Sequence, residues 1–172
     1  MGAIEAKPKT PYQQAIERVL EKISDSGLPW PAKPKDYGEE YTFPSDPTSL
    51  TYQAIGQLQA RLAGWHGYAV RILAIADMAA DMLQGRFDIA LSLKMAELEA
   101  DDGKRGLKDI LRARALGADP GLQAAAYALI EKSAYAKMLK AQASIYEQQA
   151  KAISREQSRR SDDIRMKQGN MS

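Results

Sequence analysis

Residues 51–83 read TYQAIGQLQARLAGWHGYAVRILAIADMAADML, and this stretch decides the fold. Its apolar residues recur in alternating steps of four and three, which predicts one continuous helix with a heptad-repeat side and not a strand. Thr51 is expected to cap this helix, with Leu50 and Ile55 as a hydrophobic staple, and the helix is expected to run to about Ala100. The heptad positions are Leu58, Leu62, Trp65, Ala69, Ile72, Ala76, Ala79 and Leu83.

Trp65 falls on the heptad side, so we expect it to be a core residue that faces a returning helix. Small residues gather on the opposite side of the same helix. Each glycine costs about 1 kcal/mol relative to alanine in an exposed helix, so their presence predicts close packing on that side. The N-terminal helix, the linker or another subunit must cover it; we favour a homo-oligomer, with cover by the chain itself as the alternative. The residues proposed for packing or oligomer contact are Gly56, Ala60, Trp65, Gly67 and Ala74.

Two segments precede the long helix. A shorter helix is expected from Pro11 to about Ser26, because Thr10 and Gln13 fit a capping box and Gly27 suits a helix end. Its apolar side carries Tyr12, Ile16, Val19, Leu20 and Ile23. Prolines then forbid a helix as far as residue 47, which predicts an extended connector. The aromatic residues of this connector are expected to pin it onto a helical surface.

The second half of the chain predicts a return helix. The sequence DDGKRG at 101–106 breaks the long helix, and LKDILRARAL at 107–116 predicts a short basic helix. Asp119 and Pro120 then cap a final helix from Gly121 to about Arg165. Apolar residues that line one side of it are Tyr127, Ile130, Ala134, Met138, Ala141, Ile145 and Ala152.

The predicted fold class is therefore all-α: a long antiparallel helical hairpin, coiled-coil-like, with a short basic connecting helix and an N-terminal helix on a proline-rich linker. We expect residues 1–48 to form the N-terminal helix and linker, 49–165 the hairpin, and 166–172 a disordered tail.

Composition narrows the classes of function. The chain has no cysteine and one histidine, which excludes disulfides and argues against a zinc site. No signal peptide, membrane span, catalytic triad or phosphate-binding loop is recognisable. We therefore expect a soluble, cytoplasmic protein that is not an enzyme, with no catalytic residue, metal or cofactor and no membrane partner.

Basic residues, by contrast, gather in two segments, and in each of them three are spaced by four residues, which places them on one helix face. Such stripes suit phosphate backbones and predict nucleic-acid binding, although a solvated helix surface is the plain alternative. Tyr146 could add base stacking, which would favour single strands. The candidate DNA-binding residues are Lys104, Arg105, Lys108, Arg112, Arg114, Lys151, Arg155, Arg159 and Arg160.

The segment TSLTYQAIGQLQARLAGWHGYAVRI at 48–72 resembles the opening helix of the UvsY family of phage recombination mediators, and GRFDIAL and AISREQSRR further along also resemble that group. The resemblance covers roughly residues 47–167. It implies an oligomer in a bacterial host that binds single-stranded DNA and helps load a recombinase of the RecA type. The rival hypothesis is a structural or assembly module, such as a virion component or chaperone, that grips protein through its coiled coil.

Overall fold

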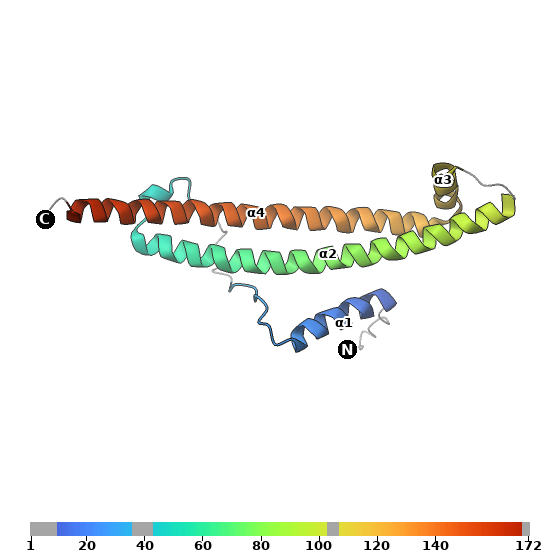
Figure 1. Ribbon diagram of the computed structural model, residues 1–172, viewed down its shortest axis with the longest axis horizontal. Coiled ribbons are helices and arrows are strands. Elements are labelled where there is room, and N and C mark those ends of the chain that lie inside the picture. Colours follow the sequence, from blue (N-terminus) through green and yellow to red (C-terminus); the bar gives the residue numbers. More distant parts are fainter. Residues whose placement is uncertain (1–9, 36–42, 103–106, 170–172) are drawn as a thin grey trace, which may run out of the picture. The chain divides into compact units, whose positions relative to one another are not determined.

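The computed structural model describes residues 10–35, 43–102 and 107–169. Within these ranges the chain is mainly helical and contains no strand. The helices are α1 (Pro11–Asp25), α2 (Tyr52–Asp102), α3 (Lys108–Ala118) and α4 (Pro120–Gly169), with one 3₁₀ turn, η1 (Pro47–Ser49), before α2 (Figure 1). The all-α hairpin, with α3 as its connecting helix, is confirmed.

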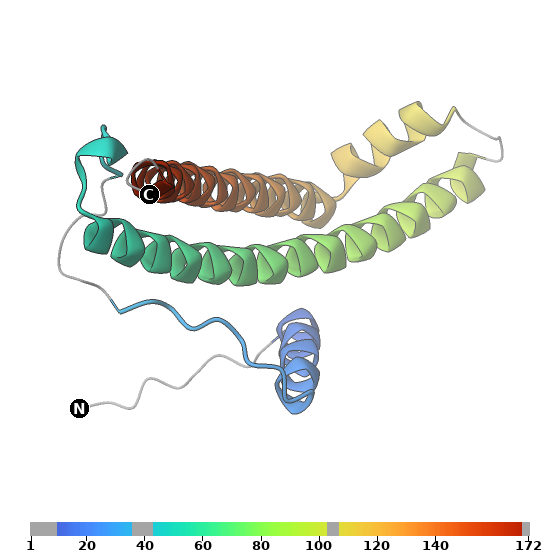
Figure 2. The same ribbon diagram turned by 60° about the vertical axis from the view of Figure 1, so that its left-hand side comes forward.

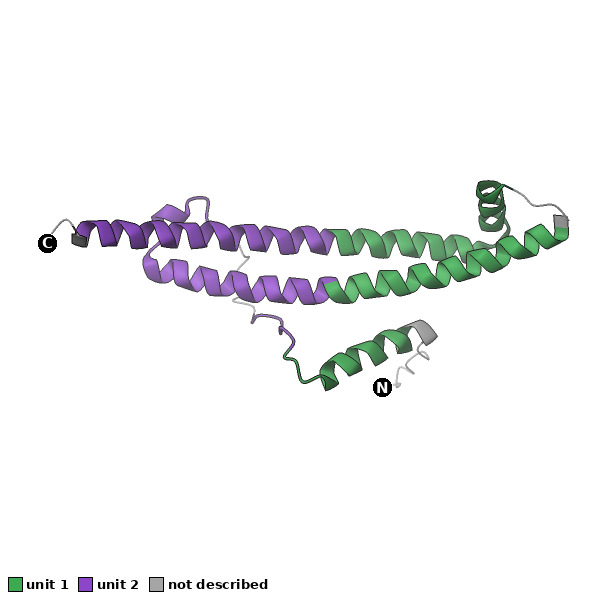
Figure 3. Ribbon diagram, in the orientation of Figure 1, with its two compact units in different colours: residues 1–29, 74–137 green, residues 30–73, 138–172 purple. Residues whose placement is uncertain are grey.

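The two long helices are shared between two compact units (Figure 3). Unit 1 comprises residues 1–29 and 74–137, and unit 2 comprises residues 30–73 and 138–172. In each unit a stretch of α2 runs alongside a stretch of α4, as Figures 1 and 2 show from two sides. Each unit has its own hydrophobic cluster.

Hydrogen bonds to capping side chains mark the residues at which the helices begin. The Gln13 amide donates to the Thr10 hydroxyl at 3.3 Å, and the Thr10 amide donates to the Gln13 side-chain oxygen at 2.9 Å, which is the predicted capping box. α1 ends at Asp25, and Gly27 adopts a positive φ of 72° that a side chain would disfavour. For α2, Thr51 Oγ1 accepts from the Ala54 amide at 3.2 Å.

The heptad side of α2 is confirmed in part. Leu62, Ala69 and Ala76 are buried, and the other predicted positions are half-buried, Trp65 among them. Ile55, expected only as a staple residue, is fully buried one heptad before Leu62.

In unit 1, α3 and the start of α4 pack on the second half of α2. The buried residues are Phe87, Leu91, Ala115 and Leu122. Phe87 lies eleven residues after Ala76, a spacing that fits 3.67 residues per turn and not the 3.5 of a heptad. The heptad predicted up to Leu83 therefore gives way to a different spacing where the third helix joins the core.

In unit 2 the core consists of Ile55, Leu62 and Ile153. Phe43 and Leu50, which precede α2, pack against this cluster together with Tyr146 of α4. Leu50 and Ile55 thus share one cluster, as the predicted staple requires.

The final helix begins as predicted and ends later. Asp119 Oδ1 accepts from the amides of Gly121 at 2.7 Å and Leu122 at 3.2 Å, so the first turn is capped. α4 continues to Gly169, because nothing after Arg165 stops a helix before that glycine; the expected tail from 166 is helical as far as the structure describes it.

The side of α4 that packs is not the apolar side that its spacing picked out. Its buried residues are Leu122, Ala136, Ala143, Ile153 and Glu156, whereas Tyr127, Ile130 and Met138 are 73%, 64% and 70% exposed. Alanines are buried on both helices: Ala76 and Ala136 in unit 1, Ala69 and Ala143 in unit 2. Small residues let two helices approach closely, so this alanine-lined side, and not the bulkier one, meets α2.

Candidate functional site

The proline-rich linker lies on the small-residue side of α2, within unit 2. A β-carbon on Gly67 would meet the ring of Pro31 at 3.5 Å, and one on Gly64 would meet Pro34 at 3.5 Å. At these two glycines the chain itself covers the helix, which is the alternative prediction and not the favoured one of a second subunit. No described residue lies within 4 Å of a β-carbon position on Gly56, and Ala60 and Ala74 are exposed.

Arg71 holds the linker in place. Its guanidinium donates to the Pro31 carbonyl oxygen at 3.0 Å and lies 5.0 Å from the centre of the Trp30 ring, a cation–π contact. Arg71 Nε is buried without a hydrogen-bond partner in the part of the chain that the structure describes. The linker aromatic Trp30 is therefore pinned to a helical surface, as the sequence predicted.

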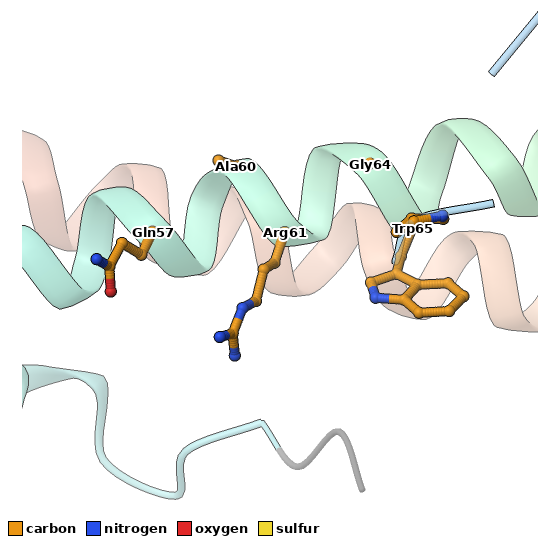
Figure 4. Close-up of a pocket in the computed structure, with 6 residues that line it drawn as sticks. Gln57, Ala60, Arg61, Gly64 and Trp65 are labelled. Atoms are coloured by element: carbon orange, nitrogen blue, oxygen red, sulfur yellow. The ribbon is translucent and has the colours of Figure 1, made fainter. Parts of the chain in front are cut away.

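Trp65 borders a surface hollow instead of lying in the core. The hollow has a volume of about 380 Å³. In Figure 4, Gln57, Arg61 and Trp65 extend to one side of α2, while Ala60 and Gly64 lie on the other edge. The Trp65 ring meets Tyr68 edge-on, with centroids 6.3 Å apart. Pro34 completes the part of the lining that the structure describes, and this part contains no carboxylate and no nucleophile. The described side chains therefore offer a contact surface and no acid–base pair.

Two of the predicted DNA-binding cations on α4 are engaged in ion pairs. Lys151 Nζ lies 2.6 Å from Glu147, and Arg159 lies 2.8 Å from Glu156 and 2.9 Å from Asp163. The pairs with Glu147 and Asp163 are exposed and therefore weak, so they lower the attraction for phosphate without abolishing it, whereas the Glu156 partner of Arg159 is buried.

Arg160 stabilises the fold through hydrogen bonds to a distant segment of the chain. Its guanidinium donates to the carbonyl oxygens of Leu50 at 2.6 Å and Thr48 at 2.7 Å, and Nε donates to Glu156 at 2.6 Å. The side chain is 18% exposed. Arg160 thus ties η1 and the start of α2 to α4 in unit 2, and its donors face backbone carbonyls and not solvent.

Glu156 is the buried acid of this arrangement, 8% exposed. Hydrogen bonds from Arg159 and then Arg160 to its carboxylate lower the pKa of Glu156 to about 2. Sequence reasoning missed the role of Glu156, because a glutamate inside a basic segment resembles any other solvated charge.

The remaining predicted cations differ in availability. Lys108 and Arg112 are exposed on α3 in unit 1, and Arg155 is exposed on α4 in unit 2; none of the three makes a hydrogen bond or ion pair with a described residue. Arg114 is exposed but interacts with another residue. Lys104 and Arg105 lie outside the described residues. Tyr146, the proposed base-stacking residue, packs against the core of unit 2.

Unit 1 displays large apolar side chains on two outward-facing helix surfaces. The outer α4 face consists of Tyr127, Ile130 and Ala134. The outer α2 face consists of Asp88, Ile89, Ser92 and Leu93, which line a shallow depression. Ile89 and Leu93 are 65% and 68% exposed. In unit 2, α4 carries Met138, which is 70% exposed, and Ile145, which is 45% exposed, together with the exposed Ala141.

Over the described ranges, histidine, aspartate and glutamate side chains nowhere gather in a group of three that fits a metal ion. Nor does any described helix combine the length and apolarity needed to cross a bilayer.

Comparison with known proteins gives no relative. No family model matches the chain, no curated protein matches it, and no solved structure matches it. The resemblance to UvsY-type mediators stays a prediction.

Proposed function

We propose that this protein is a non-enzymatic helical assembly module that binds helices of partner proteins, copies of itself included, through its outer apolar faces. The observation that carries this is the exposure of Tyr127 and Ile130 on the side of α4 that, in unit 1, points away from α2. A helix packed on one side normally carries charged and polar residues on the other. Contiguous apolar residues there mark an interaction surface.

The energetics favour a helix as the ligand. Burying a side chain of the size of Ile130 contributes about 1.5–3 kcal/mol, so a useful affinity needs several such residues buried together. The apolar residues on α4 recur at steps of three and four, a spacing that a second helix can match along its length.

Site-specific photo-crosslinking tests this function. The full chain is expressed in the cells from which it comes, with a photoreactive residue at position 130. This residue is expected to form covalent adducts with other protein molecules. A photoreactive residue at Lys132, which is exposed two residues further along α4 but on another side of the helix, is the matched control. Equal yields at both positions, or no protein adduct at position 130, would contradict the proposal.

A second function, binding of single-stranded DNA as a recombination or replication accessory, is supported by a narrower set of residues. Lys108 and Arg112 are exposed one turn apart on α3, while Leu111 and Ala115 of that helix are buried. Arg155 is likewise exposed. On this hypothesis Lys108, Arg112 and Arg155 contact phosphates. Arg160 stabilises the fold and does not bind DNA.

Titration of labelled oligonucleotides at several salt concentrations tests DNA binding. The hypothesis predicts a preference for single strands and a log–log salt slope of about −0.7 per phosphate neutralised. Replacing both Lys108 and Arg112 by alanine is expected to make the slope shallower, whereas Lys151→Ala, which removes an already paired cation, changes it less. An absence of binding at low salt would contradict this hypothesis and would not affect the proposed assembly function.

A further inference from the structure

The two helix segments that carry the outer faces of unit 1 differ in net charge. From residue 74 to 101, α2 carries six carboxylates against Arg86 and Lys94, a net charge of −4. From residue 120 to 137, α4 carries Lys132 and Lys137 against Glu131, a net charge of +1. Two copies that met through their α2 faces would bring like charges together, which is unfavourable, whereas α4 against α2 brings opposite charges together.

The two faces also match in size and in form. Each presents two large apolar side chains three or four residues apart, Ile89 and Leu93 on α2 and Tyr127 and Ile130 on α4. The α2 pair borders a shallow depression that Asp88 and Ser92 complete. A protruding ring such as that of Tyr127, which is 73% exposed, suits a depression of this kind.

Both faces point away from the core of their own unit. At about 100° per residue, Ile89 lies about 200° from the buried Phe87, and Tyr127 lies about 140° from the buried Leu122. These residues are therefore left uncovered by the packing of α2 and α4 within the unit, and they are accessible to a second molecule.

Resting on the proposed assembly function, we propose that the partner is a second copy of this chain, and that the contact is head-to-tail: the outer α4 face of one copy packs on the outer α2 face of the next. A contact between two different surfaces leaves one unused face at each end. Such a contact builds rings when its rotation closes and open chains when it does not.

Complementation between two variants tests this pairing directly. The variant Y127S/I130S loses the α4 face, and the variant I89S/L93S loses the α2 face; both pairs are exposed, so circular dichroism should show each variant folded. By sedimentation velocity the unaltered full chain is expected to assemble beyond a monomer and each variant alone to be a monomer. An equimolar mixture of the two is expected to give a 1:1 dimer and nothing larger, because one intact α4 face meets one intact α2 face.

A matched control uses exposed apolar residues elsewhere in the same unit. Leu107 and Ile110, at the start of α3, are 74% and 55% exposed, and L107S/I110S is expected to leave assembly unchanged. Lys137→Glu is expected to weaken assembly of the unaltered faces, and added salt is expected to weaken it as well.

The outcomes separate the two proposals. A monomeric full chain that still forms adducts with a different protein from position 130 overturns self-assembly and keeps the assembly function. Continued assembly of I89S/L93S, with Y127S/I130S monomeric, overturns the head-to-tail pairing in favour of α4 against α4. A mixture that stays monomeric overturns it too.

Discussion

Arg160 and Glu156, one turn apart on α4, lie 2.6 Å from each other, and the rest of the Arg160 guanidinium reaches the backbone before α2. The arginine therefore joins two segments separated by more than a hundred residues of sequence. The Glu156 carboxylate also accepts hydrogen bonds from Arg159. The two neighbouring arginines therefore share this partner, but Arg160 also bonds to the backbone before α2.

Replacing Arg160 by alanine is expected to destabilise unit 2 by about 2 kcal/mol, because hydrogen bonds from a charged donor contribute about 1.5–3 kcal/mol each and are not additive. Arg159→Ala is the comparison: Arg159 also bonds to the buried Glu156, but its own side chain is 56% exposed and both of its partners lie on α4, so a smaller cost of about 1 kcal/mol is expected there. Chemical denaturation followed by circular dichroism measures both. Equal costs for the two arginines would refute the structural role of Arg160.

Acid is expected to loosen the same region. The folded-state pKa of Glu156 is about 2, against an ordinary value of 4.5 in the unfolded chain. A depressed pKa means that the stabilisation is complete above the ordinary value and fades as the pH falls from about 4.5 toward about 2. Hydrogen bonds donated by Thr48 to Asp46 and by Lys151 to Glu147 likewise lower the pKa of each carboxyl group. Protonation of these two groups adds to the loss of stability in acid.

The variant Glu156→Gln isolates the contribution of that one carboxylate. Thermal midpoints measured across this pH range should fall less steeply for the variant than for the unaltered protein. Parallel curves would show that the Glu156 charge does not stabilise the fold.

A large side chain at Gly67 is expected to displace the linker. Leucine there would occupy the space of the Pro31 ring, which already lies at contact distance from a β-carbon position. The ¹⁹F resonance of Trp30 in protein labelled with fluorotryptophan, assigned with a Trp65→Phe variant, should move to a solvent-exposed position. Gly56→Leu, where nothing lies within 4 Å, should leave it unmoved; the same spectrum for both variants would argue against linker docking.

Arg71→Met is expected to release Trp30 as well, because it removes the cation–π contact and the bond to the Pro31 carbonyl while keeping an apolar side chain of similar length. The readout is again the Trp30 resonance. If Arg71→Met leaves that resonance unchanged, then packing of the prolines on the glycines holds the linker by itself.

Gly85→Ala is expected to stabilise unit 1 by about 1 kcal/mol, because glycine weakens a helix interior by that amount and nothing lies within 4 Å of a β-carbon there. Gly121→Ala is the contrast: its β-carbon would come within 3.0 Å of Asp119 Oδ1, the atom that caps α4. A gain in stability for both variants, by chemical denaturation, would show that the cap tolerates the methyl group.

Much of the fold was predictable from local sequence. Thr10, Thr51 and Asp119 start helices where their side chains can accept amide hydrogen bonds, and Gly27 ends the first one. These signals act over a few residues, so a single sequence suffices to read them. The candidate site was less predictable, since its residues depend on contacts between segments far apart in the chain.

By itself, the sequence determined the helices and their caps, and it indicated in part which side of α2 is buried, because helical periodicity sets the angle of every side chain about the helix axis. Only the tertiary structure decided which side of α4 is buried. There the alanine-lined side with Ala136 and Ala143 packs inward and the side with Tyr127 and Ile130 remains outward, because small residues permit closer contact between helices. Periodicity favoured the bulkier side of α4, whereas the observed choice depends on how the surfaces of two helices fit together.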